Sequence, residues 1–158
     1  MASSVLVAEV VNGTKRFEAV LALADRVLEQ RRYIVSEVPG AFSDHVIGAF
    51  DGERCLGFLR FYIQVIGSEE GRPPVLLRGS PLTEGFVEAF GVDPKARRLG
   101  IGSSLQSHAQ EMARAVGCWQ MRSRSPVSSV ENYAMKLAAG YVLQPSNEND
   151  SYYFLKKL

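Results

Sequence analysis

The chain has 158 residues, a length typical of one domain with a single core, and 46% of them are hydrophobic. Its 18 lysines and arginines against 17 aspartates and glutamates leave a net charge of +1, which argues against a broad nucleic-acid interface. No basic leader with an apolar core and no membrane-spanning apolar run is present. The two cysteines and two histidines follow no metal-binding spacing. We therefore predict one cytoplasmic domain over residues 1–158, with free buried thiols, no metal and no membrane partner.

The first half of the chain predicts three strands and one helix. Residues 5–11 form an apolar strand, and Thr14 then caps a helix with apolar residues at helical spacing from Phe17 to Leu28. Residues 46–50 and 55–66 are typical of strands. Asp51-Gly52 between them indicates a hairpin.

The second half begins with a long, proline-broken connection over residues 67–83. A strand over 86–92, a helix after Gly102 that ends at Gly117, and a strand over 118–122 then form a β–α–β passage, which predicts a parallel pair. Ser128-x-x-Glu131 is a capping box for a helix that ends at Gly140. Residues 141–143 and 152–155 complete an α+β domain with a mixed sheet.

The segment from Val92 to Ser104 carries the strongest functional signal. It follows a strand, opens a helix and contains two arginines, two glycines and two serines. Free backbone N–H groups and the positive end of a helix dipole favour an anion there, such as a phosphate. The G-x-x-x-x-G-K-[S/T] loop is absent. The G-x-G-x-x-G pattern fails because Leu105 stands in the third glycine's place.

The remaining pattern, V-x-P-x-x-R-x-x-G-I-G over residues 92–102, resembles that of the GNAT-type N-acetyltransferases. Glu131-Asn132-Tyr133-Ala134, followed by Gly140-Tyr141, is similar to the second motif of that family, and residues 152–158 to its last strand. The resemblance covers nearly the whole chain. It implies the GNAT fold, with a mixed central sheet of about six or seven strands flanked by about four helices, and acetyl-CoA as cosubstrate.

The resemblance also assigns the CoA-binding residues. Backbone groups of the 86–92 strand would pair with the pantetheine arm, and one N–H there would polarise the thioester carbonyl. The loop amides and arginines would hold the pyrophosphate, Ser103 would donate its hydroxyl, and Asn132 would contact CoA from the second motif. The complete set is Phe90, Gly91, Val92, Arg97, Arg98, Leu99, Gly100, Ile101, Gly102, Ser103 and Asn132.

Acetyl transfer to an amine requires a base, because an ammonium group must first lose a proton. Strand alternation predicts that the residues at 84, 86, 88, 90 and 92 share one face. Glu88 would then lie between Phe86 and Phe90, where desolvation raises its pKa. Glu88 is the first candidate base and Glu84 the second. The alternative for Glu88 is a solvated or paired carboxylate.

The residue at the position where the family commonly has its proton donor differs from the family pattern. Lys136 stands four residues before Gly140, where the family commonly has a tyrosine. Tyr133, one helical turn earlier, is the candidate catalytic acid from the sequence, and its alternative is a core or rim aromatic. At this point the acid stays unassigned.

The predicted function is N-acetylation of a primary amine on a small molecule, a peptide or a protein. The alternative is a CoA-binding sensor or interaction module without catalysis. The connection over 67–83 carries Arg72 and Arg78 around an apolar stretch. It could line the acceptor pocket, contact the second subunit of a homodimer, or stand exposed to solvent.

Overall fold

The computed structural model describes residues 4–126, 128, 130–146 and 150–158. Four α-helices lie within them: α1 (Lys15–Arg26), α2 (Arg31–Val35), α3 (Ile101–Ala115) and α4 (Val130–Ala138). None of the helices described is long and apolar enough to cross a membrane. The strands are β1 (Leu6–Glu9), β2 (Ser43–Asp51), β3 (Arg54–Val65), β4 (Leu76–Leu77), β5 (Ser80–Pro81), β6 (Thr83–Val92), β7 (Gln120–Pro126), β8 (Val142–Pro145) and β9 (Ser151–Lys157).

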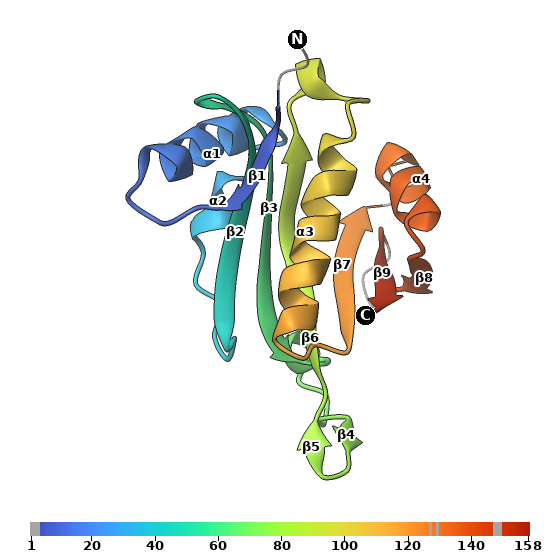
Figure 1. Cartoon of the computed structure of the whole chain (residues 1–158). Helices are drawn as coiled ribbons and strands as arrows, with labels where there is room; N and C mark the ends of the chain where they lie inside the picture. Colours follow the sequence, from blue (N-terminus) through green and yellow to red (C-terminus); the bar gives the residue numbers. More distant parts are fainter. Residues whose placement is uncertain (1–3, 127, 129, 147–149) are drawn as a thin grey trace.

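Seven of these strands form one sheet in the order β1-β2-β3-β6-β7-β9-β8 (Figure 1). Neighbours pair antiparallel except β6 and β7, which are parallel. The mixed sheet and the parallel pair across α3 confirm the prediction from the β–α–β passage. β4 and β5 make a separate two-stranded hairpin within the long connection.

The helices cover both faces of the sheet. α1 and α2 pack over one face around Val20, Leu23 and Phe58, and α3 packs over the other around Leu59, Leu105 and Ala109. Residues from β7 and β9 also belong to the core on this second face. Two cores therefore sandwich one sheet, and Cys55 and Cys118 are free, buried thiols within them, as predicted.

α1 begins where the sequence predicts it. The Thr14 hydroxyl oxygen accepts a hydrogen bond from the Phe17 N–H at 3.2 Å, which satisfies one of the free amides of the first turn. The helix ends before Val27, however, so Leu28 does not belong to its apolar stripe. Leu28 has a φ of 57° and is 82% exposed.

The pairing of β6 with β7 is short. It runs only from Glu84 opposite Gln120 to Val87 opposite Ser123. Beyond that point β7 continues against β9 and β6 against β3. We call the place where the two strands separate, at Val87 and Ser123, the fork. Above it, residues 88–92 of β6 have one edge without a neighbouring strand (Figure 1).

A β-bulge in β6 lies directly above the fork. Phe61 pairs with Val87 and Arg60 with Ala89, so Glu88 is one extra residue in the strand. The prediction that residues 84, 86, 88, 90 and 92 share one face is therefore wrong. Phe86 stacks on Tyr62 on the α2 side, whereas Phe90 packs with the α3 core. The bulge reverses the alternation between them and leaves Glu88 on the α2 side.

The connection over 67–83 holds a 3₁₀ turn (Ser68–Glu70) and the β4–β5 hairpin. The hairpin projects from the end of the sheet opposite the start of α3, with its apolar residues exposed (Figure 1). The turn is tied to the sheet by Arg122, which pairs with Glu69 and Glu84 and lies 3.8 Å from Glu70.

Glu84 is fully buried in this cluster. It accepts hydrogen bonds from Arg122 at 2.7 Å, Gln64 at 3.0 Å and Gln120 at 2.9 Å. A carboxylate held in this way has a structural role, and Glu84 is removed as a candidate base.

Replacing Arg122 with methionine should lower the free energy of unfolding by about 3–5 kcal/mol, because it leaves the buried Glu84 carboxylate without its cation. Urea unfolding measures this loss. Arg114→Met is the matched control, since Arg114 pairs with Glu111 on the surface and its loss should cost under about 1 kcal/mol. Equal losses in the two variants would contradict the assignment.

Candidate active site

The loop between β6 and α3 is anchored at its start. Asp93 is buried, and its carboxylate accepts a hydrogen bond from the Lys95 N–H at 3.0 Å, which caps the 3₁₀ turn over Pro94–Ala96. This bond lowers the pKa of Asp93, and Arg54 lowers it further. Ala96 is buried in the α3 core. The loop is therefore held in one conformation at the sheet.

The end of the loop exposes the first amides of α3. Arg98 and Gly100 have left-handed φ values of 65° and 75°, and Gly100 is the N-cap. A side chain at Gly100 would meet no atom within 4 Å, so the space above this amide is open. The first N–H groups of a helix have no intrahelical acceptor. Together with the exposed Arg97 and Arg98, they make an anion-binding end.

The residues predicted to bind CoA in this region differ in what they expose. Leu99 and Ser103 are exposed, whereas the Ile101 side chain is buried in the core, which leaves only its amide for a ligand. A Cβ at Gly102 would come within 3.1 Å of both Phe90 and Met135. Gly102 therefore permits the close approach of α3 to β6 and α4.

The free edge of β6 is occupied by a side chain. The Gln30 amide donates to the Phe90 carbonyl oxygen at 3.0 Å, and its carbonyl accepts from the Phe90 N–H at 3.1 Å. Gln30 follows Leu28 and Glu29, which both have left-handed φ values, 57° and 51°. The backbone groups predicted to pair with pantetheine thus hold a carboxamide. Nothing in the sequence pattern distinguishes Gln30, and sequence reasoning missed it.

A Cβ built at Gly91 and the Val92 side chain point to opposite faces of β6. A Cβ at Gly91 would come within 2.8 Å of Phe58 and Val27, so this glycine lets α1 approach the strand. Val92 packs against the α3 core and lies 3.6 Å from the Cβ position of Gly102. Both residues therefore contribute to the edge through their backbone.

Glu88 is partly buried at the bulge. Desolvation raises its pKa, and the positive charges of Arg60 and Arg124 oppose this rise. The direction agrees with the sequence prediction, but the surroundings differ, because Phe90 lies on the other face. A carboxylate with a raised pKa binds a proton more readily than an ordinary one, which suits a general base next to the strand edge.

Arg60 fixes the wall opposite Glu88. It is 1% exposed and donates to both oxygens of Asp44 at 2.9 and 2.7 Å. It also donates to the Tyr33 carbonyl at 2.7 Å and to Ser36. These bonds hold α2 against the sheet. Sequence reasoning missed Arg60, although one arginine within the apolar run of β3 is a signal for a buried, satisfied charge.

The second motif meets β7 above the fork. The Asn132 amide donates to the Ser125 hydroxyl at 2.6 Å, and its Oδ1 is buried without a hydrogen-bond partner. The Tyr133 hydroxyl lies 3.4 Å from the Ser125 carbonyl oxygen, and its ring packs edge-on against Phe154. Burial raises the pKa of Tyr133.

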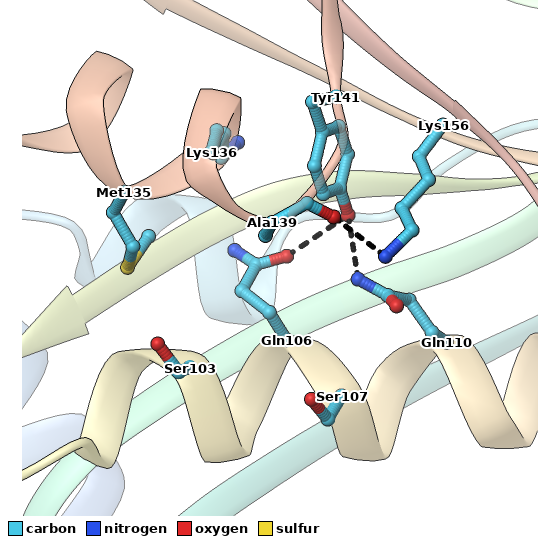
Figure 2. Close-up of a pocket in the computed structure, with 9 residues that line it drawn as sticks. All are labelled: Ser103, Gln106, Ser107, Gln110, Met135, Lys136, Ala139, Tyr141 and Lys156. Carbon is cyan, nitrogen blue, oxygen red and sulfur yellow. Dashed lines mark hydrogen bonds between the residues drawn. The ribbon is translucent and has the colours of Figure 1, made fainter.

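α4 turns a lysine inward. Lys136 is 2% exposed and donates to the Ser123 hydroxyl, whereas Val130 and Leu137 of the same helix are exposed. Burial lowers the pKa of Lys136 to about 7. A cavity of about 190 Å³ separates this helix from α3 (Figure 2). It is lined by Ser103, Gln106, Ser107, Gln110, Met135, Lys136, Ala139, Tyr141 and Lys156.

Comparison with known proteins agrees with this geometry. Residues 17–137 match the acetyltransferase (GNAT) family. A stretch of 56 residues is 36% identical to an aminoglycoside N(6′)-acetyltransferase type 1 of Klebsiella aerogenes, and it spans 35% of this chain and 37% of that protein.

Solved structures share the fold. Arabidopsis thaliana NAA60 in complex with a bisubstrate analogue has a TM-score of 0.74 at 12% identity, over 98% of this chain and 99% of that one. The GNAT domain of S. lividans PAT has a TM-score of 0.70 at 18% identity, over 96% and 89% of the two chains.

Proposed function

Because the chain belongs to the GNAT acetyltransferase family, we propose that it transfers an acetyl group from acetyl-CoA to a primary amine by direct attack of the amine on the thioester. One observation carries the proposal. Above the fork, the free edge of β6 runs from Glu88, a carboxylate with a raised pKa, towards the loop that ends at the anion-binding start of α3. Each of these serves a different part of the reaction.

The residues fit acetyl-CoA. The first amides of α3, with Arg97 and Arg98, would hold the pyrophosphate. The free edge of β6 at Phe90 takes a carboxamide already, and pantetheine carries two amides. The buried Asn132 Oδ1 and Gln106 Nε2 lack partners, so a bound ligand would satisfy them.

Acetyl-CoA, when bound, supplies the activated acyl carbon. The chain then has to remove a proton from the amine, and we assign this step to Glu88. Because Glu88 lies on the α2 side of the sheet, opposite the α3 side, we place the approach of the amine between α2 and β6. Arg60 and α2 would form the wall of that entrance.

We propose an amine of a small molecule or of a peptide as the acceptor. The Klebsiella aerogenes relative is named for an aminoglycoside, and the NAA60 complex holds a bisubstrate analogue. The name of the Klebsiella aerogenes relative, an aminoglycoside N(6′)-acetyltransferase, supports an amine as the acceptor. An aminoglycoside and a peptide with a free N-terminus are therefore the two acceptors to test first.

Calorimetry with acetyl-CoA should give a dissociation constant below about 100 µM. Gly100→Val should weaken binding at least tenfold, because valine does not adopt a φ of 75° without strain and its side chain would enter the open space above the amides. Gly117→Val is the control, since Gly117 has a φ of 83° and no neighbours at the other end of α3. No acetyl-CoA binding by the native chain would refute the proposal.

Glu88→Gln should lower kcat/KM for acetylation by about 10²–10⁴-fold, as expected for the loss of a base. The native activity should fall as the pH drops through the raised pKa of Glu88, since protonation removes the base, and the variant should lack this limb. Thiol release with an aminoglycoside and with a peptide measures both. Native turnover by the variant would exclude Glu88. Binding of acetyl-CoA without turnover of any acceptor would favour the CoA-binding module.

Gln30→Ala should raise the affinity for acetyl-CoA by about tenfold, because pantetheine no longer has to displace two hydrogen bonds from Phe90. The affinity for 3′-phosphoadenosine 5′-diphosphate, which lacks pantetheine, should stay unchanged. Calorimetry with both ligands makes the comparison. Weaker acetyl-CoA binding by the variant would mean that Gln30 contacts the ligand instead of giving way to it.

A further inference from the structure

The proposed reaction leaves one buried ionisable group without a role. Lys136 is the fully buried lysine of the described residues, and its Nζ donates to the Ser123 hydroxyl. Ser123 is the last residue of β7 that pairs with β6. The ammonium therefore lies at the fork. Glu88, the first residue of β6 above the fork, lies on the opposite face of the sheet.

The surroundings of Lys136 supply no negative charge. The rings of Tyr141 and Phe154 lie 5.6 and 5.1 Å from its Nζ. On α3, Gln106 and Gln110 are neutral and bind the Tyr141 hydroxyl, and from β9 the Lys156 Nζ donates to the Ala139 carbonyl (Figure 2). Among the described residues no carboxylate pairs with Lys136. An anion bound at the fork would therefore supply the negative charge that Lys136 lacks among the described residues.

We propose that Lys136 is a catalytic residue that gives its proton to the sulfur of the departing CoA, with Ser123 holding its Nζ at the fork. This inference rests on the proposed acetyl transfer. It assigns the acid to Lys136 in place of Tyr133. The Tyr133 hydroxyl faces a carbonyl of β7 beyond the fork, while the Lys136 Nζ lies at the fork itself.

The protons and electrons of the step balance. The amine nitrogen forms a bond to the acyl carbon, the C–S bond breaks, and sulfur leaves with the bonding pair. Glu88 takes the proton from the amine, and the Lys136 ammonium gives one to sulfur, so that CoA leaves as a thiol. Glu88 then gives its proton to solvent, and solvent that reaches the cavity between α3 and α4 returns one to Lys136, so both groups are reset.

The proton affinities agree with this direction of transfer. Burial lowers the pKa of Lys136 to about 7, so the amine carries a proton for part of the time at neutral pH and releases it readily. Burial raises the pKa of Tyr133 above its ordinary value, which makes that phenol a poorer donor. Both pKa shifts favour Lys136 over Tyr133 as the proton donor.

Titration of bound CoA tests the inference without any acceptor. The thiolate of CoA absorbs more strongly in the far ultraviolet than the neutral thiol. The ionisation of the thiol can therefore be followed on the protein–CoA complex as the pH is raised. The Lys136 ammonium and a thiolate next to it would stabilise each other, so the thiolate keeps Lys136 protonated above its own pKa and the two groups titrate as a pair. We expect the thiol of CoA on the native chain to ionise at least about one pH unit lower than on Lys136→Met. Tyr133→Phe should match the native chain.

The outcomes separate the two proposals. Failure of the native chain to bind CoA overturns the proposed function. Binding of CoA with the same thiol ionisation in the native chain and in Lys136→Met overturns the role of Lys136. A shift in Tyr133→Phe but not in Lys136→Met would assign the acid to Tyr133. Should the methionine variant unfold, Ser123→Ala is the second variant, because it releases Nζ without removing the charge. It should raise the ionisation pH in part, and no change there would also count against Lys136.

Discussion

The separation of β6 from β7 after only four residue pairs is the constraint on which the rest of the site depends. A strand without a neighbour leaves N–H and C=O groups that must find partners elsewhere. In this chain Gln30 satisfies two of them at Phe90. Glu88 on one face of the sheet and Lys136 on the other both lie beside the point where the two strands separate.

The two faces at the fork have different electrostatic character. On the α2 side, Glu88 is a carboxylate whose charge is partly balanced by Arg60 and Arg124. On the α3 side, Lys136 is an amine with aromatic neighbours and no counter-ion among the described residues. Burial weakens the charged form of both groups, which brings their pKa values toward each other from opposite ends of the scale. In the proposed reaction this convergence would favour proton transfer by both groups.

Patterns of residue spacing were enough to predict much of the fold. The order along the chain of the strands in the main sheet, the helices α1, α3 and α4, the Asp51-Gly52 hairpin and the Thr14 cap all follow from local chemistry that neighbours in sequence determine. The short helix α2 and the β4–β5 hairpin were not predicted. The bulge at Glu88 does not follow from local chemistry, because the extra residue is defined by pairing with β3, and the spacing of apolar residues in the sequence carries no sign of it.

The same limit applies to single side chains whose partners are distant in sequence. The helix α4 exposes the apolar Val130 and Leu137 and buries Lys136, because the Ser123 hydroxyl on β7 accepts a hydrogen bond from the Lys136 Nζ. Gln30 reaches Phe90, sixty residues away, through a turn that two left-handed residues create. Neither contact follows from any repeat in the sequence.

Arg60 has a consequence for how such a protein diversifies. One guanidinium both fastens α2, a helix of only five residues, and moderates the proton affinity of Glu88. If Glu88 is the base and the amine passes α2, as we propose, the shape of the entrance and the strength of the base both depend on this single position. A substitution of Arg60 would then change both at once, whereas substitutions within α2 would change the entrance alone.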